Sequence, residues 1–223
     1  VHGSRGLGDV YKRQFLQCVV PFIGTRTNGY GLMNFGTAAA NLQFALLLFA
    51  FAALTHAFVT SDFSVRLVTL NSHSLKPLLY KISGVWGNHE GSMLLWVLIL
   101  ALFGASATWF GSNLPIRLKA TVLSVQGAVG LAFLMFIVFT SNPFLRIFPI
   151  PFDGQDLNPL LQDPGLAFHP PFLYLGYVGL SMSFSFAVAA LIEGRVDAAW
   201  GRWVRPWTLA AWLFLTIGIC LLY

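Results

Sequence analysis

The chain has few charged residues. Only 9% of its 223 residues are Asp, Glu, Lys or Arg, whereas 57% are hydrophobic and the mean hydropathy is +0.72. A soluble domain carries about a quarter charged residues, so this composition indicates an integral membrane protein. The net charge of +5 does not indicate nucleic-acid binding, because the cations stand at the ends of apolar segments and form no basic patch with interleaved aromatic residues.

Cysteine and the common catalytic motifs are also scarce. The two cysteines, Cys18 and Cys220, form no CxxC pair, which argues against a disulfide framework and a structural zinc site. The sequence has no phosphate-binding loop and no His-Glu-x-x-His helix, which argues against ATPase and metalloprotease functions, and no Ser, His and Asp arrangement stands out for hydrolysis. The long apolar segments carry no ionisable residue near their middle, which disfavours a transporter of polar substrates.

Five apolar segments are candidates to cross a membrane, for which a helix needs about 20 residues. They run over residues 38–59, 93–111, 120–140, 171–192 and 207–219. The last segment is too short for a complete crossing, as a truncated span would be. The sequence therefore predicts an all-α polytopic membrane protein with about five transmembrane helices, the last of them truncated.

The connections between these segments predict the topology. The two short connections are dense in cations, at Arg117, Lys119, Arg195, Arg202 and Arg205. The long connections, 60–92 and 141–170, have a lower density of cations, although the first of them does carry Arg66, Lys76 and Lys81. By the positive-inside rule, the short connections face the cytoplasm and the long ones lie on the outer face of the membrane.

The two ends of the chain differ from the rest. Residues 1–14 are polar, Gly-rich and without periodicity, and they are too hydrophilic for a signal peptide. Residues 4–14 back-translate to a sequence that resembles a common transposon-type sequencing adapter, and residues 220–223 back-translate to one that resembles the reverse complement of the end of that adapter. We therefore expect residues 1–14 and 220–223 to be adapter-derived, rather than a flexible natural tail, and residues 15–219 to be the membrane region of a longer protein.

One histidine stands beside two prolines at the outer end of the fourth segment. Residues 163–165, Asp-Pro-Gly, predict a type II turn, because Pro presets φ at the second position and Gly accepts a positive φ at the third. Pro170 disfavours helical backbone at His169, and Pro170 with Pro171 suits the first turn of a helix. We therefore expect His169 in extended backbone just outside the helix, with its imidazole held at the outer membrane surface.

Two interpretations of His169 stay open from the residues alone. The imidazole caps the helix by bonding a loop carbonyl, or it serves as an axial haem ligand, which needs a neutral ring in partly dry surroundings. The neighbouring sequence would supply aromatic surface from Phe168, Phe172, Tyr174 and Tyr177. Gly176 and Gly179 would admit the close approach of either a neighbouring helix or a flat ligand.

A second candidate lies at the end of the first outer connection, in GVWGNHEGSMLLW. Residues 87–88 favour a turn, and Ser92 is the predicted N-cap of a helix that starts at Met93. Glu90 would complement the dipole of that helix. His89 either binds a ligand or belongs to an aromatic anchor at the membrane interface, formed with Trp86 and Trp96.

Two further histidines carry less information. His56 lies near the outer end of the first segment, where it either reaches the interface or acts as a ligand or proton relay. His73 lies in the outer connection and is predicted to be an ordinary loop residue.

Four longer motifs resemble the N-terminal half of the cytochrome c maturation protein F (CcmF) family. They are WGNHEGSMLLW, FTSNPF, DLNPLLQDPGLAFHPPFLYLGYVG and RPWTLAAWLFLTIGI, and the resemblance covers residues 15–219. It implies a haem lyase subunit of cytochrome c-type biogenesis, which attaches haem covalently to apocytochrome c at the outer face. It also implies a multi-pass protein of the bacterial inner membrane, or alternatively of the mitochondrial inner membrane.

In that family the histidine of the HPP motif is one of two outer-face ligands proposed for the haem, and His169 matches it. The resemblance thus implies haem b as cofactor with His169 as its iron ligand, and we keep secondary candidates for haem contact at Trp86, His89, Phe168 and Tyr174. The implied partners are the haem-carrying chaperone CcmE, the thiol-handling subunits CcmH and CcmI, apocytochrome c and membrane lipid, with no nucleic acid.

The resemblance also implies that this region is incomplete. A Trp-rich segment, the second outer histidine and the two histidines of a separate intramembrane haem would lie beyond Ile219, so the region alone is not expected to bind haem stably or to be active. The residues present supply no evident acid or base for the attachment step. A haem exporter or carrier is the alternative function, and a purely structural membrane subunit is a third.

Overall fold

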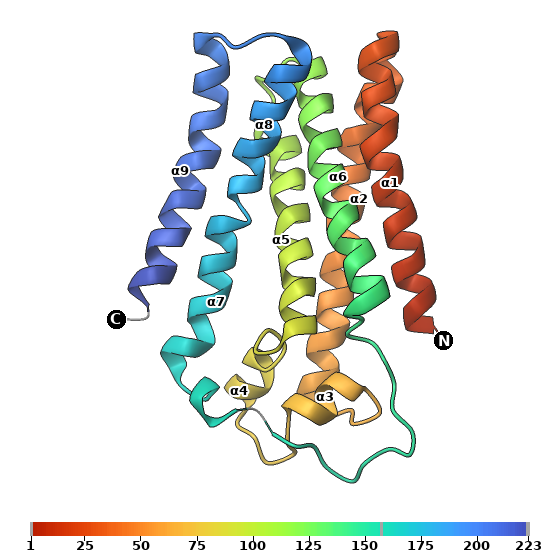
Figure 1. Ribbon diagram of the computed structural model, residues 1–223, viewed down its shortest axis with the longest axis vertical. Coiled ribbons are helices and arrows are strands. Elements are labelled where there is room, and N and C mark those ends of the chain that lie inside the picture. Colours follow the sequence, from red (N-terminus) through yellow and green to blue (C-terminus); the bar gives the residue numbers. More distant parts are fainter. Residues whose placement is uncertain (1, 157, 222–223) are drawn as a thin grey trace.

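The computed structural model describes residues 2–156 and 158–221. Long helices lie side by side along one axis, and the short helices and long connections gather at one end (Figure 1). Apart from an isolated antiparallel bridge between Val65 and Arg146, the regular elements of these residues are all helical. They are α1 (His2–Thr27), α2 (Tyr30–Val59), α3 (Arg66–Asn71), α4 (Leu78–Ser83), α5 (His89–Phe110), α6 (Ile116–Thr140), η1 (Pro159–Leu161), α7 (Pro164–Tyr177), α8 (Leu180–Glu193) and α9 (Ala198–Cys220).

Five helical segments are long and apolar enough to cross a membrane. They are Tyr30–Val59, His89–Phe110, Ile116–Thr140, Pro164–Glu193 and Ala198–Cys220. Each covers one of the five predicted apolar segments, apart from Gly111 at the end of the second, so the prediction of an all-α polytopic membrane protein is confirmed. The fourth segment consists of α7 and α8, which meet at a turn formed by Val178 and Gly179.

The predicted start of the fifth span at residue 207 is wrong. α9 begins at Ala198, because Asp197 caps it by accepting a hydrogen bond from the Trp200 backbone N–H at 2.9 Å. The arginines and Pro206 lower the hydropathy of this part of the sequence, yet they lie within the helix. The helix is 23 residues long, which is sufficient for a crossing.

The long helix α1 was not predicted. It lies against α6, where Gln17 Nε2 donates to the Leu123 carbonyl at 3.3 Å. A Cβ at Gly127 of α6 would lie 3.1 Å from the Cys18 backbone nitrogen, so the two helices touch through their backbones. The polar side chains of α1 hide it from a search by hydropathy. The origin of residues 1–14 and 220–223 stays a prediction.

Apolar side chains from α2, α5, α6 and α8 form one core, whose fully buried members include Leu54, Leu94, Leu123 and Phe186. A small polar cluster is embedded in it. Gln126 of α6 donates to Ser181 Oγ at 2.9 Å and accepts from Ser185 Oγ at 2.8 Å. Such hydrogen bonds hold membrane helices together, because lipid offers no alternative partner for a buried polar group.

Glycines bring the fourth span into close contact with the fifth span and with the second. A Cβ at Gly176 of α7 would lie 2.5 Å from the backbone of Leu215 in α9. A Cβ at Gly179 would lie 2.6 Å from the ring of Phe103 in α5. The alternative left open by the sequence is thus resolved, because neighbouring helices and not a flat ligand occupy the space beside both glycines.

We predict that Gly176→Ala lowers the free energy of unfolding by about 1–3 kcal/mol, because the added methyl group meets backbone that has no rotamer to change. The measurement is thermal unfolding of the detergent-solubilised protein. Gly201→Ala is the matched control, since a Cβ at Gly201 meets nothing within 4 Å and alanine favours a helix by about 1 kcal/mol. Equal melting temperatures for Gly176→Ala and wild type would contradict the close contact.

Candidate functional site

Four histidines whose surroundings the structure describes lie at the end of the bundle that carries the two long connections (Figure 1). His56 lies in the last turn of α2, His73 follows α3, His89 begins α5, and His169 lies in α7. The sequence-based topology places this end on the outer face of the membrane.

His169 lies inside a helix, so the predicted extended conformation is wrong. α7 begins at Pro164, and Asp163 is its N-cap, with Oδ1 accepting from the Leu166 N–H at 3.1 Å. The predicted type II turn at residues 163–165 is therefore wrong as well. Asp is a favoured N-cap and Pro a favoured first helical residue, and this pairing outweighs the tendency of Pro170 to disfavour helical backbone before it.

Pro171 creates an opening in the hydrogen bonding of α7. It lacks an N–H, so the Ala167 carbonyl one turn earlier has no helical donor at that position. The indole Nε1 of Trp86 donates to this carbonyl at 2.9 Å. The connection that precedes α5 is therefore fastened to α7 two residues before His169, and the structure brings Trp86 to the site.

The His169 ring is fixed by α9. Its Nδ1 lies 2.6 Å from the Gly218 carbonyl oxygen, and the side chain is partly buried. A carbonyl only accepts, so we assign the proton to Nδ1, which leaves the lone pair of the neutral ring on Nε2. A Cβ at Gly218 would lie 2.8 Å from the Leu173 backbone nitrogen, so glycine is what allows this carbonyl to approach α7.

The four neighbouring aromatic residues do not form one cage around His169, because successive helical positions turn by about 100°. Phe172 packs toward α9, with its ring centroid 6.4 Å from that of Phe214. Tyr174 and Tyr177 instead pack on Trp96 of α5, at centroid distances of 6.0 and 4.8 Å. Phe168 is 48% exposed.

His89 is held by a serine. Its Nε2 lies 3.0 Å from Ser141 Oγ, which joins the start of α5 to the end of α6, and its ring meets Phe136 edge-on. The N-cap of α5 is Asn88, whose Oδ1 accepts from the Gly91 N–H at 2.7 Å. The predicted cap at Ser92 is therefore wrong, because Asn88 offers an equally good acceptor one turn earlier.

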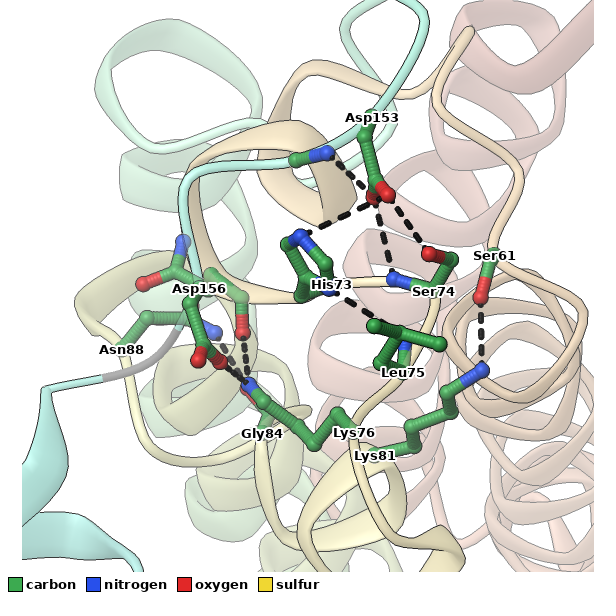
Figure 2. Close-up of polar contacts among 12 residues, drawn as sticks. Ser61, His73, Ser74, Leu75, Lys76, Lys81, Gly84, Asn88, Asp153 and Asp156 are labelled. Carbon is green, nitrogen blue, oxygen red and sulfur yellow. Dashed lines mark hydrogen bonds and ion pairs between the residues drawn. The ribbon is translucent and has the colours of Figure 1, made fainter.

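The two long outer connections are clasped together by polar contacts, which Figure 2 shows. Asp153 accepts from the backbone N–H and the hydroxyl of Ser74 at 3.0 and 2.5 Å, and His73 Nε2 lies 3.4 Å from it. Lys76 Nζ lies 3.0 Å from Asp156 Oδ1. We call this set of contacts the clasp. His73 is a loop residue, as predicted, and it lies where the two long connections meet.

The clasp also changes the ionisation of its members. Hydrogen bonding, first of all from the Ser74 hydroxyl, lowers the pKa of Asp153. Burial lowers the pKa of the Lys76 ammonium, and the contact with Asp156 opposes that effect. A backbone bridge reinforces the junction, because the Arg66 N–H donates to the Leu145 carbonyl at 2.8 Å.

Sequence reasoning missed the clasp and the Gly218 carbonyl. One signal for the clasp was present, since His73 and Lys76 are three residues apart and so are Asp153 and Asp156. The Gly218 carbonyl leaves no such signal, because any backbone carbonyl can accept a hydrogen bond and only the packing of α9 selects this one.

Comparison with known proteins gives consistent relatives. Residues 86–221 match the family described as "Cytochrome C assembly protein". The chain is 71% identical to the cytochrome c-type biogenesis protein ccl1 of Rhodobacter capsulatus over 206 residues, which is 92% of this chain and 32% of the relative. It is 64% identical to the cytochrome c-type biogenesis protein CycK of Rhizobium meliloti, over 92% of this chain and 30% of that relative.

A solved structure described as "Cytochrome c Heme Lyase CcmF" has the same fold, with a TM-score of 0.82 and 27% sequence identity. The match covers 97% of this chain and 34% of that one. The chain therefore spans about a third of the length of the curated and solved relatives that it matches.

We predict that Trp86→Phe lowers the free energy of unfolding by about 1–3 kcal/mol, because the Ala167 carbonyl loses the donor that replaces the missing Pro171 N–H. Thermal unfolding in detergent measures the loss. Trp212→Phe is the control, since Trp212 is 60% exposed on α9. If the two variants have the same melting temperature, the indole hydrogen bond does not stabilise α7.

We predict that Asp153→Asn lowers the melting temperature at neutral pH, and that the difference in melting temperature between this variant and wild type disappears at acidic pH. The pKa of Asp153 is depressed, so its contribution is complete above the ordinary carboxyl pKa of 3.8 and is lost as the pH falls through the lower value of the folded state. Melting curves of both proteins across this pH range test it. Asp163→Asn is the control, because asparagine caps a helix as well as aspartate does. A gap that does not depend on pH would contradict the charged clasp.

Proposed function

The chain belongs to the cytochrome c assembly protein family, and from this premise we propose that it serves cytochrome c-type biogenesis by presenting His169 as an axial ligand for haem at the outer face of the bacterial inner membrane. Five membrane-crossing segments and bacterial relatives make it a multi-pass membrane protein. The observation that carries the proposal is the hydrogen bond between His169 Nδ1 and the Gly218 carbonyl.

This hydrogen bond prepares the imidazole for iron. Histidines that bind metals usually donate their other ring N–H to a carbonyl or carboxylate, which fixes the tautomer and makes the free nitrogen a better ligand. In this chain Nδ1 donates to Gly218, so Nε2 is the nitrogen that would bind. His169 lies inside α7, whose N-cap is Asp163, so it does not cap the helix, and its bond to Gly218 leaves Nε2 available for the proposed ligand role.

The surroundings of His169 suit a flat apolar molecule better than an ionic one. Phe168, the preceding residue, leaves 48% of its surface exposed, and Trp86 reaches the backbone of the same turn. We propose these two residues as the first haem contacts. Tyr174 packs toward α5, and His89 is bonded to Ser141, so both are more distant candidates within the proposal.

The proposed contribution of the chain to haem attachment is positioning. Attachment adds the S–H of an apocytochrome cysteine across a haem vinyl group, and holding the reactants in place supplies much of the rate of such a step. We propose that CcmE delivers haem b, that CcmH and CcmI hold the apocytochrome thiols, and that His169 holds the iron. The second axial ligand is proposed to come from the remainder of a longer protein, since the relatives are about three times as long as this chain.

We predict that His169→Gly abolishes haem binding and lowers the yield of holocytochrome c by roughly tenfold or more, because the iron loses an axial ligand. The measurements are the haem absorption of the purified full-length protein and the covalently bound haem of a reporter cytochrome c in cells. Imidazole added to the medium should restore part of the yield by occupying the space left by the side chain. His73→Gly is the control. It also removes an imidazole from this end of the bundle, but His73 belongs to the clasp and not to the proposed haem site, so haem binding and cytochrome yield should be retained.

Each outcome of this experiment has a separate meaning. Wild-type haem content and cytochrome yield in His169→Gly would defeat the ligand role. If wild-type protein released its haem to an acceptor but formed no covalent cytochrome c together with its partners, the alternative of a haem carrier or exporter would replace the lyase.

A further inference from the structure

The end of the bundle opposite the clasp contains a basic cavity that the haem function does not use. It has a volume of about 630 Å³ and lies where α1 ends, α2 and α6 begin, and α8 turns toward α9 (Figure 1). Its lining includes Arg26, Tyr30, Arg117, Ile192, Glu193 and Arg195. The sequence-based topology places this end in the cytoplasmic leaflet of the membrane.

Positive charge dominates the cavity. Three arginines and one glutamate line it, which leaves a formal charge of +2. The Glu193 carboxylate is engaged at the wall, because its Oε1 accepts from Thr121 Oγ1 at 3.0 Å. Arg195 bonds Asp197 through Nε at 3.1 Å, which leaves its two terminal nitrogens for another partner. Arginine binds phosphate with two parallel N–H groups, so these side chains favour a phosphate oxygen over water.

The start of α6 adds a second attraction for an anion. Its N-cap is Pro115, which provides no side-chain acceptor, and the first backbone hydrogen bond runs from the Lys119 N–H to the Pro115 carbonyl at 2.9 Å. The N–H groups of the first turn are therefore without helical acceptors at the cavity wall. An uncapped N-terminus of a 25-residue helix carries a partial positive charge that stabilises an anion.

The remaining lining suits a lipid. Met33, Ile116 and Ile192 give the basic cavity an apolar side, and Tyr30 is 70% exposed beside it. A free phosphate or a nucleotide would find the charge but would leave this apolar surface in contact with water. A phospholipid places its phosphodiester among arginines and its glycerol and acyl chains on apolar residues. Basic cavities between helices at the cytoplasmic face bind such headgroups.

We propose that this cavity is a binding site for an anionic phospholipid of the inner leaflet, whose phosphodiester is held by Arg26, Arg117 and Arg195. The three arginines come from α1, α6 and the turn between α8 and α9, so one lipid headgroup joins three parts of the chain. Arg117 already joins two of the elements, since its Nη2 donates to the Thr25 carbonyl at 3.1 Å. The site is independent of the proposed haem ligand at the other end of the bundle.

Lipid titration of the delipidated protein tests the proposal. Melting temperatures are measured in a neutral detergent with added cardiolipin, with phosphatidylglycerol, with phosphatidylcholine or with inorganic phosphate. We expect the two anionic lipids to raise the melting temperature in a saturable way and the neutral lipid and free phosphate to leave it unchanged. The apparent Kd for cardiolipin should rise roughly tenfold in Arg195→Gln, which loses a charge-assisted contact of ordinary strength.

The matched control is Arg205→Gln, which removes the same charge from an exposed residue of α9 outside the cavity lining. Arg26→Gln is the second cavity variant, and it leaves the bond between Arg117 and Thr25 intact. The proposal is supported if both cavity variants lose affinity and Arg205→Gln keeps it. It is overturned if all three lose affinity equally, which would indicate general surface charge, or if inorganic phosphate or phosphatidylcholine stabilises the protein as well as cardiolipin does.

Discussion

The contact between α7 and α9 is the constraint on which the outer end of this molecule depends. Two glycines, Gly176 and Gly218, let the backbones of the fourth and fifth spans approach each other closely. Only at that separation can a main-chain carbonyl of α9 reach the ring of His169. The orientation of the imidazole is therefore a property of helix packing rather than of the local sequence around the histidine.

The prolines of α7 act through the same packing. Pro170 and Pro171 remove two helical donors, which in an isolated helix would cost about 3 kcal/mol or more. Part of that cost is offset because Trp86 donates to one of the freed carbonyls. A break in helical hydrogen bonding thus becomes an attachment point between the first outer connection and the segment that carries His169. At the site, two other parts of the chain, the first outer connection and α9, are each joined to α7 by a hydrogen bond.

The sequence was sufficient to predict the membrane-crossing segments but not the residues at which their helices begin. Hydropathy identifies a crossing segment because a run of about 20 apolar residues is rare outside membrane-spanning helices, and all five were found. Helix starts were misplaced at Asp163, Asn88 and Asp197, because a capping side chain can begin a helix well outside the apolar run. The motif singled out His169 as the candidate ligand, and that role stays a prediction. The hydrogen-bond partner of His169, the Gly218 carbonyl, could not be predicted, because every residue has a backbone carbonyl and the sequence does not distinguish one from another.

The clasp between the outer connections has a consequence for how the protein is made. One of its sides belongs to the hairpin of α2 and α5, and the other belongs to the hairpin of α6 and α7. A ribosome delivers the first hairpin before the second. In the topology predicted from the sequence, Ser74 and Lys76 therefore reach the outer side of the membrane while Asp153 and Asp156 are still unsynthesised or inside. The junction can close only after both hairpins have been inserted in the correct orientation. A chain with one hairpin inverted would leave the buried Lys76 ammonium without the Asp156 carboxylate, and an unpaired buried charge destabilises a fold.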